Sequence, residues 1–121
     1  MNVNRISPML AVANMNETVD FYTSVLGFRE SMSSDAYSIV EADGQTIHLM
    51  LASSEEVMEA VRGHADIYIE VNDLDGIWKR VSRFKDKFQT KAPFTQPYGM
   101  REFHISDPNE CLVFVGQRIV G

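Results

Sequence analysis

The sequence predicts an α+β fold made of two modules, each with one strand, one helix and three further strands. Short apolar runs with strand alternation are interrupted twice by segments of helical spacing, and residues 12–16 at the exit of the first strand resemble residues 71–75. Module one is expected at about 1–52 and module two at about 64–121. A length of 121 residues suits one domain spanning 1–121.

The first module starts with an apolar run at 6–13 that leads into a helix. Asn14 precedes Glu17 by three residues, a spacing typical of a capping box at a helix start. Gly27 is suited to end this helix in the left-handed conformation. The helix is expected to cover a sheet through an apolar stripe formed by Met15, Val19, Tyr22 and Leu26.

Three strands are expected after this helix, at 28–32, 37–42 and 45–51. Asp43-Gly44 between the last two is a strong hairpin signal. Because side chains alternate across a strand, the third strand divides its residues between the two faces of the sheet. The residues expected toward the helix are Ile47, Leu49 and Leu51, and those expected toward a cavity are Thr46, His48 and Met50.

The second module repeats this order after a polar linker at 53–63, whose start predicts a short helix. A strand is expected at 65–71, followed by a helix that Asp73 caps. The same alternation places polar and aromatic side chains of this strand toward the cavity. The set expected toward the cavity is Asp66, Tyr68 and Glu70, and the opposing set is Ile67, Ile69 and Val71.

The remainder of the second module is expected to hold two strands near 101–106 and 111–116. Between the helix and these two strands, Pro93 and Pro97 are expected to break any regular strand, because proline cannot donate a backbone hydrogen bond. The preceding helix shows an apolar face of Leu74, Ile77, Trp78, Val81 and Phe84.

The composition excludes several classes of protein. A net charge of −6 opposes non-specific binding to the phosphates of nucleic acid. No apolar stretch approaches the roughly 18 residues that span a bilayer, and the single Cys111 cannot form an intrachain disulfide, so a cytoplasmic protein without membrane contact is expected. The sequence also lacks a phosphate-binding glycine loop, a nucleophile elbow and an HExxH motif.

Segments at the start of each module and at the end of the chain resemble motifs of the vicinal oxygen chelate superfamily, which includes glyoxalases, bleomycin resistance proteins and extradiol dioxygenases. Segments 12–15, 19–22 and 26–28 are similar to the start of such domains, and 71–75 resembles its second copy. The resemblance covers nearly the whole chain and implies two βαβββ modules in one glyoxalase/bleomycin resistance-like domain. The segments that resemble the ending of bleomycin resistance proteins are 98–103, 107–109 and 114–117.

The metal-dependent members hold a divalent ion with four inward side chains, typically His, Glu or Gln. By this resemblance, the four positions fall on Ser7, His48, Asp66 and Phe114. Phe114 has no donor atom and Ser7 has only a weakly donating hydroxyl, which leaves two ordinary ligands. We therefore expect no metal and no cofactor, although Glu102 and His104 could rebuild a displaced site.

The resemblance to fosfomycin resistance enzymes implies two further inward positions, at Glu102 and His104. Tyr98 is expected to act as a lid, and Tyr37 and Tyr68 are further candidates to line a pocket. The alternative is that each polar residue is only a solvated or hydrogen-bonded strand residue. The predicted ligand-binding residues are His48, Asp66, Tyr98, Glu102, His104 and Phe114.

Two functions are compatible with these residues. The first is a binding protein that resembles bleomycin resistance proteins and sequesters an aromatic or cationic small molecule in a cleft without metal, as in antibiotic resistance. The second is a glyoxalase-like lyase, isomerase or transferase with an atypical divalent metal site near His48 and with Glu102 or His104 as proton acceptor. Enzyme activity stays open and no catalytic residue is assigned. Relatives commonly complete the cavity with a second copy, which implies a homodimer.

Overall fold

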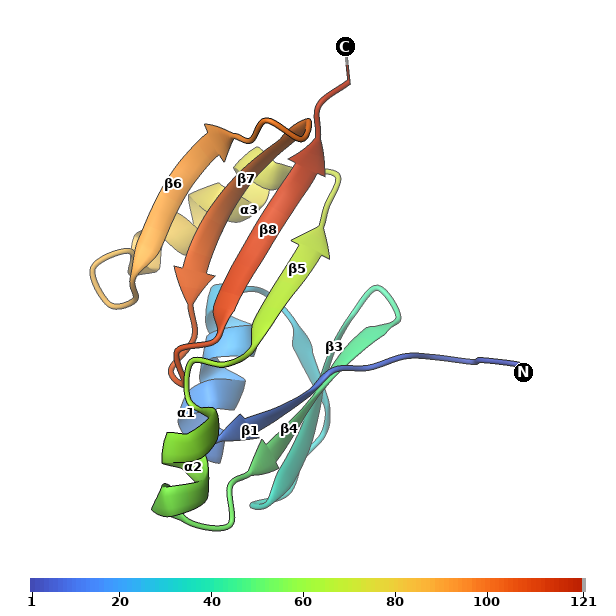
Figure 1. The fold of residues 1–121 in the computed structure, drawn as a ribbon. Helices are drawn as coiled ribbons and strands as arrows, with labels where there is room; N and C mark the ends of the chain where they lie inside the picture. Colours follow the sequence, from blue (N-terminus) through green and yellow to red (C-terminus); the bar gives the residue numbers. More distant parts are fainter. Residues whose placement is uncertain (121) are drawn as a thin grey trace. The chain divides into compact units, whose positions relative to one another are not determined.

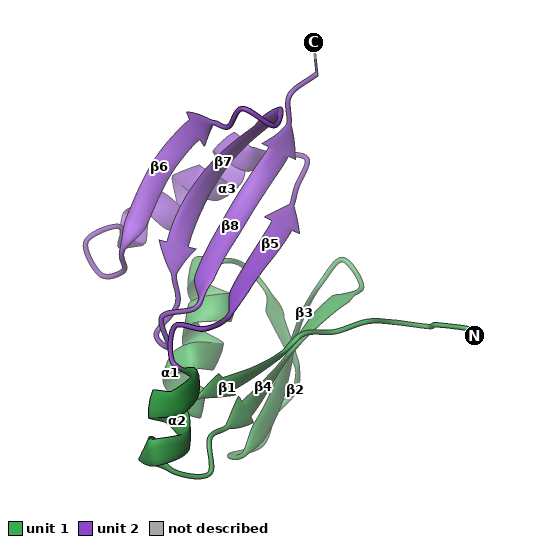
Figure 2. Ribbon diagram, in the orientation of Figure 1, with its two compact units in different colours: residues 1–61 green, residues 62–121 purple. Residues whose placement is uncertain are grey.

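The computed structural model describes residues 1–120 as eight strands with three α-helices and two shorter helical turns. The chain divides into two compact units, residues 1–61 and residues 62–121 (Figure 2). Each unit contains one four-stranded sheet and one helix after its first strand (Figure 1). The predicted α+β class with two βαβββ modules is confirmed.

The sheet of unit 1 consists of β1 (Met9–Val12), β2 (Arg29–Met32), β3 (Tyr37–Ala42) and β4 (Gln45–Leu51). Its strand order is β1-β4-β3-β2, with β1 parallel to β4 and the other pairs antiparallel. Asp43 and Gly44 join β3 to β4 with positive φ angles of 50° and 80°. These angles are those of the predicted hairpin turn.

The helix of unit 1, α1 (Met15–Asp20), begins at the predicted cap. Asn14 Oδ1 accepts a hydrogen bond from the Glu17 N–H at 3.0 Å. The helix continues as a π-helical turn, η1 (Phe21–Val25), and Gly27 follows with a φ of 89°. The predicted stripe is only partly correct, and the wider π turn, which rotates the residues after it about the helix axis, accounts for Leu26 but not for Val19. Val19 and Leu26 are half-buried, and the buried side chains are Met15, Thr18, Phe21, Tyr22 and Val25.

The core of unit 1 lies where α1 packs on β3 and β4. Ile47 and Leu49 of β4 are buried, whereas His48 between them is half-buried. The predicted alternation is confirmed here, except that Leu51 at the strand end is 43% exposed. The polar linker forms the expected short helix, α2 (Glu55–Val61).

The sheet of unit 2 consists of β5 (Asp66–Glu70), β6 (Thr90–Thr95), β7 (Met100–Ser106) and β8 (Leu112–Arg118). Its strand order is β5-β8-β7-β6, with β5 parallel to β8 and the other pairs antiparallel. This is the connectivity of unit 1. The repeated topology agrees with an internal duplication of the module.

The helix of unit 2, α3 (Leu74–Val81), is capped at the position that corresponds to Asn14. Asp73 Oδ1 accepts from the Gly76 N–H at 3.1 Å, as predicted. Gln117 Oε1 accepts from the first N–H of the helix at 2.9 Å, which fixes α3 to β8. A 3-10 turn, η2 (Ser82–Phe84), follows the helix.

The two faces of the unit 2 sheet differ in chemistry. One face packs against α3, where the rings of Trp78 and Phe103 have centroids 5.2 Å apart. Figure 1 shows α3 behind β7 and β8. The strand residues buried on this face are Phe103, Ile105, Val113 and Val115. In β5 the predicted alternation is confirmed, because Asp66, Tyr68 and Glu70 are exposed while the residues between them are half-buried.

One predicted break is wrong. Strand β6 runs through Pro93 instead of stopping there. It tolerates proline because β6 is an edge strand and its pairing register shifts between Lys91 and Phe94. Pro97, in contrast, lies in the turn between β6 and β7, where a break was expected.

Candidate functional site

The face of the unit 2 sheet that is turned away from α3 carries side chains from all four strands. Residues directly opposite one another in paired strands point to the same face. Glu102 of β7 lies opposite Phe94 of β6, and His104 lies opposite Phe114 of β8. Phe114 also lies opposite Tyr68 of β5. We call these five residues the aromatic face.

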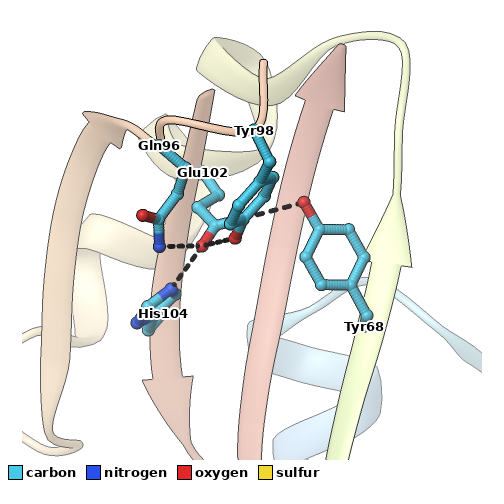
Figure 3. Close-up of polar contacts among 5 residues, drawn as sticks. All are labelled: Tyr68, Gln96, Tyr98, Glu102 and His104. Atoms are coloured by element: carbon cyan, nitrogen blue, oxygen red, sulfur yellow. Dashed lines mark hydrogen bonds and ion pairs between the residues drawn. The ribbon is translucent and has the colours of Figure 1, made fainter. Parts of the chain in front are cut away.

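Glu102 is the centre of a hydrogen-bond cluster on this face (Figure 3). Its side chain is 0% exposed. Oε1 accepts from Gln96 Nε2 at 2.8 Å and from His104 Nε2 at 3.0 Å, and Oε2 accepts from the Tyr68 hydroxyl at 2.8 Å. The Tyr98 hydroxyl lies 2.7 Å from Oε1 and 2.8 Å from Oε2, so the two oxygens share it. We call these five residues the Glu102 cluster.

The cluster keeps Glu102 ionised. Burial raises the pKa of this carboxyl, but the hydrogen bonds that His104 and the three other donors make to it lower the pKa more, and the result is a pKa of about 2 instead of 4.5. A carboxylate with four donors fully uses the roughly four acceptor positions of its two oxygens. At neutral pH this group is therefore a buried anion and a weak proton acceptor.

The two tyrosines of the cluster hold their protons strongly. Burial and the hydrogen bond to Glu102 raise the pKa of Tyr68 far above its ordinary value of 10.0. The hydrogen bond to Glu102 also raises the pKa of Tyr98, with burial as the second cause. Both hydroxyls are thus donors to the carboxylate and are not available as phenolates.

Aromatic rings surround the cluster on the aromatic face. The ring of Phe114 stacks on Tyr68 with centroids 6.0 Å apart and lies 4.2 Å from the His104 ring. On its other side, His104 meets the edge of Phe94 at 5.1 Å. Lys91 Nζ lies 3.9 Å from the Phe94 centroid, a distance at which an ammonium group is attracted to the ring. Within this face, rings therefore contact one another and one cationic side chain.

Gly116 of β8 makes room for Tyr68. A Cβ atom at this position would lie 2.0 Å from the Tyr68 hydroxyl oxygen and 2.8 Å from Cζ. Only glycine allows the ring to cross β8 and reach Glu102. The glycine near the end of the chain is thus part of the geometry of the site.

The structure brings together four of the six residues predicted to bind a ligand. Tyr98, Glu102 and His104 belong to the Glu102 cluster, and Phe114 packs against it. Asp66 starts β5 on the face of Tyr68 and is exposed. His48 lies in unit 1, where its Nδ1 is 2.5 Å from the hydroxyl of Tyr37.

Sequence reasoning missed part of this cluster. Gln96 showed no signal, because a glutamine in a proline-rich turn is ordinary. Tyr68 was a candidate for lining a pocket, but not for contacting Glu102. Its position on the polar side of β5, together with a glycine on the neighbouring strand, is the pattern from which the contact could have been found.

The residues at the superfamily's metal positions do not fit a metal. Phe114 offers no donor atom, and the Ser7 hydroxyl lies 2.5 Å from Thr46 Oγ1. The oxygens of Glu102 already accept four hydrogen bonds, which a metal ion would have to replace. Within residues 1–120 no group of three or more His, Cys, Asp or Glu side chains is arranged to hold an ion.

The fold is that of one superfamily. The chain belongs to the Glyoxalase/Bleomycin resistance protein/Dioxygenase superfamily, whose family model matches residues 3–114. No curated protein matches the sequence. Among the helices of residues 1–120, none has the length and apolar character that crossing a membrane requires.

Solved structures with the same fold include binding proteins and an enzyme relative. The bleomycin-binding protein of bleomycin-producing Streptomyces verticillus, solved with copper(II)-bleomycin, is 19% identical with a TM-score of 0.76, over 100% of this chain and 99% of that one. A bleomycin-binding protein complexed with bleomycin is 16% identical with a TM-score of 0.79, over 96% and 99%. A glyoxalase-related enzyme from Clostridium phytofermentans is 18% identical with a TM-score of 0.77, over 98% of each chain.

Proposed function

We propose that the protein is a small-molecule-binding protein that sequesters an aromatic or cationic ligand without a metal ion. The observation that carries this proposal is the aromatic face around a fully hydrogen-bonded, buried carboxylate. The bleomycin-binding proteins of the same fold support the ligand class. The proposed binding residues are His48, Asp66, Tyr98, Glu102, His104 and Phe114, within one domain at 1–121.

The chemistry of the Glu102 cluster favours binding over proton transfer. A general base works best when its pKa is near the working pH, whereas the Glu102 pKa is about 2. The aromatic rings supply stacking surface, and the carboxylate supplies a fixed negative charge. A net charge of −6 supports the same preference for cationic small molecules over nucleic acid. We also propose that the protein is cytoplasmic.

Calorimetric titration with metal-free bleomycin and with a panel of aromatic amines tests this function. We expect saturable binding by at least one compound, and Phe114→Ala should weaken it about tenfold, because losing one stacked ring removes about 1 kcal/mol or more. Lys79→Ala, which alters an exposed residue of α3, is the matched control and should bind as the wild type does.

Two results would contradict the proposal. One is the absence of binding across the panel. The other is stoichiometric zinc, nickel, manganese or iron in protein purified without chelators or affinity tags, combined with turnover of a small substrate. That second result would promote the lyase, isomerase or transferase alternative.

We also propose a closed homodimer. Its support is exposed apolar surface on strands of unit 1, where Met9 is 55% exposed and Met32 is 43% exposed. A second copy with twofold symmetry would cover such side chains on both chains at once. Light scattering at micromolar concentration should give twice the mass of one chain, 13.7 kDa, and a monomer mass would contradict the proposal.

A further inference from the structure

The group that covers Glu102 is itself exposed. Glu102 is 0% exposed, yet Tyr98, whose hydroxyl both carboxylate oxygens share, is 59% exposed. An exposed side chain exchanges rotamers on the picosecond to nanosecond timescale unless its contacts hold it. The hydrogen bond to Glu102 is the contact that Tyr98 would have to give up to move away.

The turn that carries Tyr98 is fixed independently of its side chain. The Gln96 N–H donates to the Met100 carbonyl at 2.8 Å, and the Gly99 N–H donates to the Gln96 carbonyl at 3.2 Å. The Gly99 carbonyl accepts from the Ile119 N–H at 3.0 Å. Rotation about χ1 of Tyr98 can therefore uncover Glu102 while the backbone of the turn stays in place.

The position of the Tyr98 hydroxyl is suited to a different donor. Its oxygen lies 2.7 Å and 2.8 Å from the two carboxylate oxygens. Hydrogen bonds from a charged nitrogen to a carboxylate have lengths of about 2.7–2.9 Å, so an ammonium nitrogen fits the same place. Of the four donors to Glu102, three are neutral hydroxyl or amide groups, so an ammonium would add a positive charge that they lack.

We infer that the ligand carries a primary or secondary ammonium group, which displaces the Tyr98 hydroxyl and binds between the two oxygens of Glu102. This inference rests on the proposed binding function and makes it specific. The apolar body of the ligand then lies on the rings of Tyr68 and Phe114. In the free protein Tyr98 occupies the ammonium position and competes with the ligand for it.

Three probes separate charge from hydrogen bonding. Benzylamine is a cation with N–H donors, benzyltrimethylammonium is a cation without them, and benzyl alcohol is a neutral donor. By NMR titration of the wild type, benzylamine should bind about tenfold more tightly than either of the others, because a hydrogen bond to a charged group is stronger than a neutral one. The Tyr98 ring signals should shift with benzylamine and not with benzyl alcohol.

Two variants and one control test the ammonium site. Tyr98→Phe removes the competing hydroxyl, so its affinity for benzylamine should rise about fivefold, since a larger fraction of the protein is ready to bind. The control Lys79→Ala alters an exposed residue of α3 outside the proposed binding residues and should leave the affinity unchanged. Glu102→Gln should abolish the preference for benzylamine over benzyl alcohol.

The outcomes distinguish failure of the ammonium site from failure of the proposed binding function. If all three probes bind equally, or if Tyr98→Phe weakens benzylamine binding, the ammonium site is overturned while a binding function stands. If none of the probes binds and the bleomycin and amine panel also fails, the proposed function is overturned as well.

Discussion

Replacing Glu102 with alanine is expected to lower the free energy of unfolding by about 2–4 kcal/mol. The substitution removes the shared acceptor of four donors, and the amide of Gln96 and the ring nitrogen of His104 are partly buried and would lose their partner. The loss stays below the upper range for buried ion pairs, because Tyr68 and Tyr98 are exposed residues whose hydroxyls can turn to water once the carboxylate is gone. Urea denaturation at neutral pH measures the change.

The matched control is Asp66→Ala. Asp66 is an exposed carboxylate on the same face of β5, so its removal should change stability by less than about 0.5 kcal/mol. Equal effects of the two substitutions would show that the Glu102 cluster contributes no more than an ordinary surface charge.

The pH dependence of this effect identifies its source. The pKa of Glu102 is about 2 in the folded protein and 4.5 in the reference state, so the folded state favours the ionised form. The stabilisation is therefore fully present above about pH 4.5 and is lost as the pH falls toward about 2. The stability difference between wild type and Glu102→Ala should shrink over this window. A difference that stays constant would mean that packing, not charge, is lost.

Local signals in the sequence were sufficient to predict most of the fold. The caps Asn14 and Asp73 and the hairpin Asp43-Gly44 act through neighbouring residues, so their effects can be read without knowing distant contacts. The exceptions depend on tertiary context. Pro93 is accepted because β6 turned out to be an edge strand, and the π turn at η1 shifts the buried side of the first helix.

The site was harder to predict because its contacts cross strands. The resemblance to fosfomycin resistance enzymes implied Glu102 and His104, and their spacing of two residues agrees with one face of a strand. The contact of Tyr68 with Glu102 depends on the register of three strands and on the missing side chain at Gly116. Gly116 is visible in the sequence, but the strand register that brings it next to the Tyr68 ring is not.

Gly116→Ala is expected to destabilise the protein by about 1–2 kcal/mol, although alanine is ordinarily the better residue inside a strand. The new Cβ would lie 2.0 Å from the Tyr68 hydroxyl oxygen, so the ring has to move outward. Since Tyr68 is 45% exposed, it can do so, but it then loses its 2.8 Å hydrogen bond to Glu102. Denaturation of the variant gives the size of this loss.

A double-mutant cycle shows whether the loss passes through Tyr68. The Tyr68→Ala background removes the three atoms nearest to the new methyl group. Gly116→Ala should then become neutral or stabilising by about 0.5–1 kcal/mol, because alanine restricts the unfolded chain more than glycine does. The sign of the effect thus reverses between the two backgrounds. An equal loss in both backgrounds would show that the strand itself, and not the Tyr68 ring, requires glycine at this position.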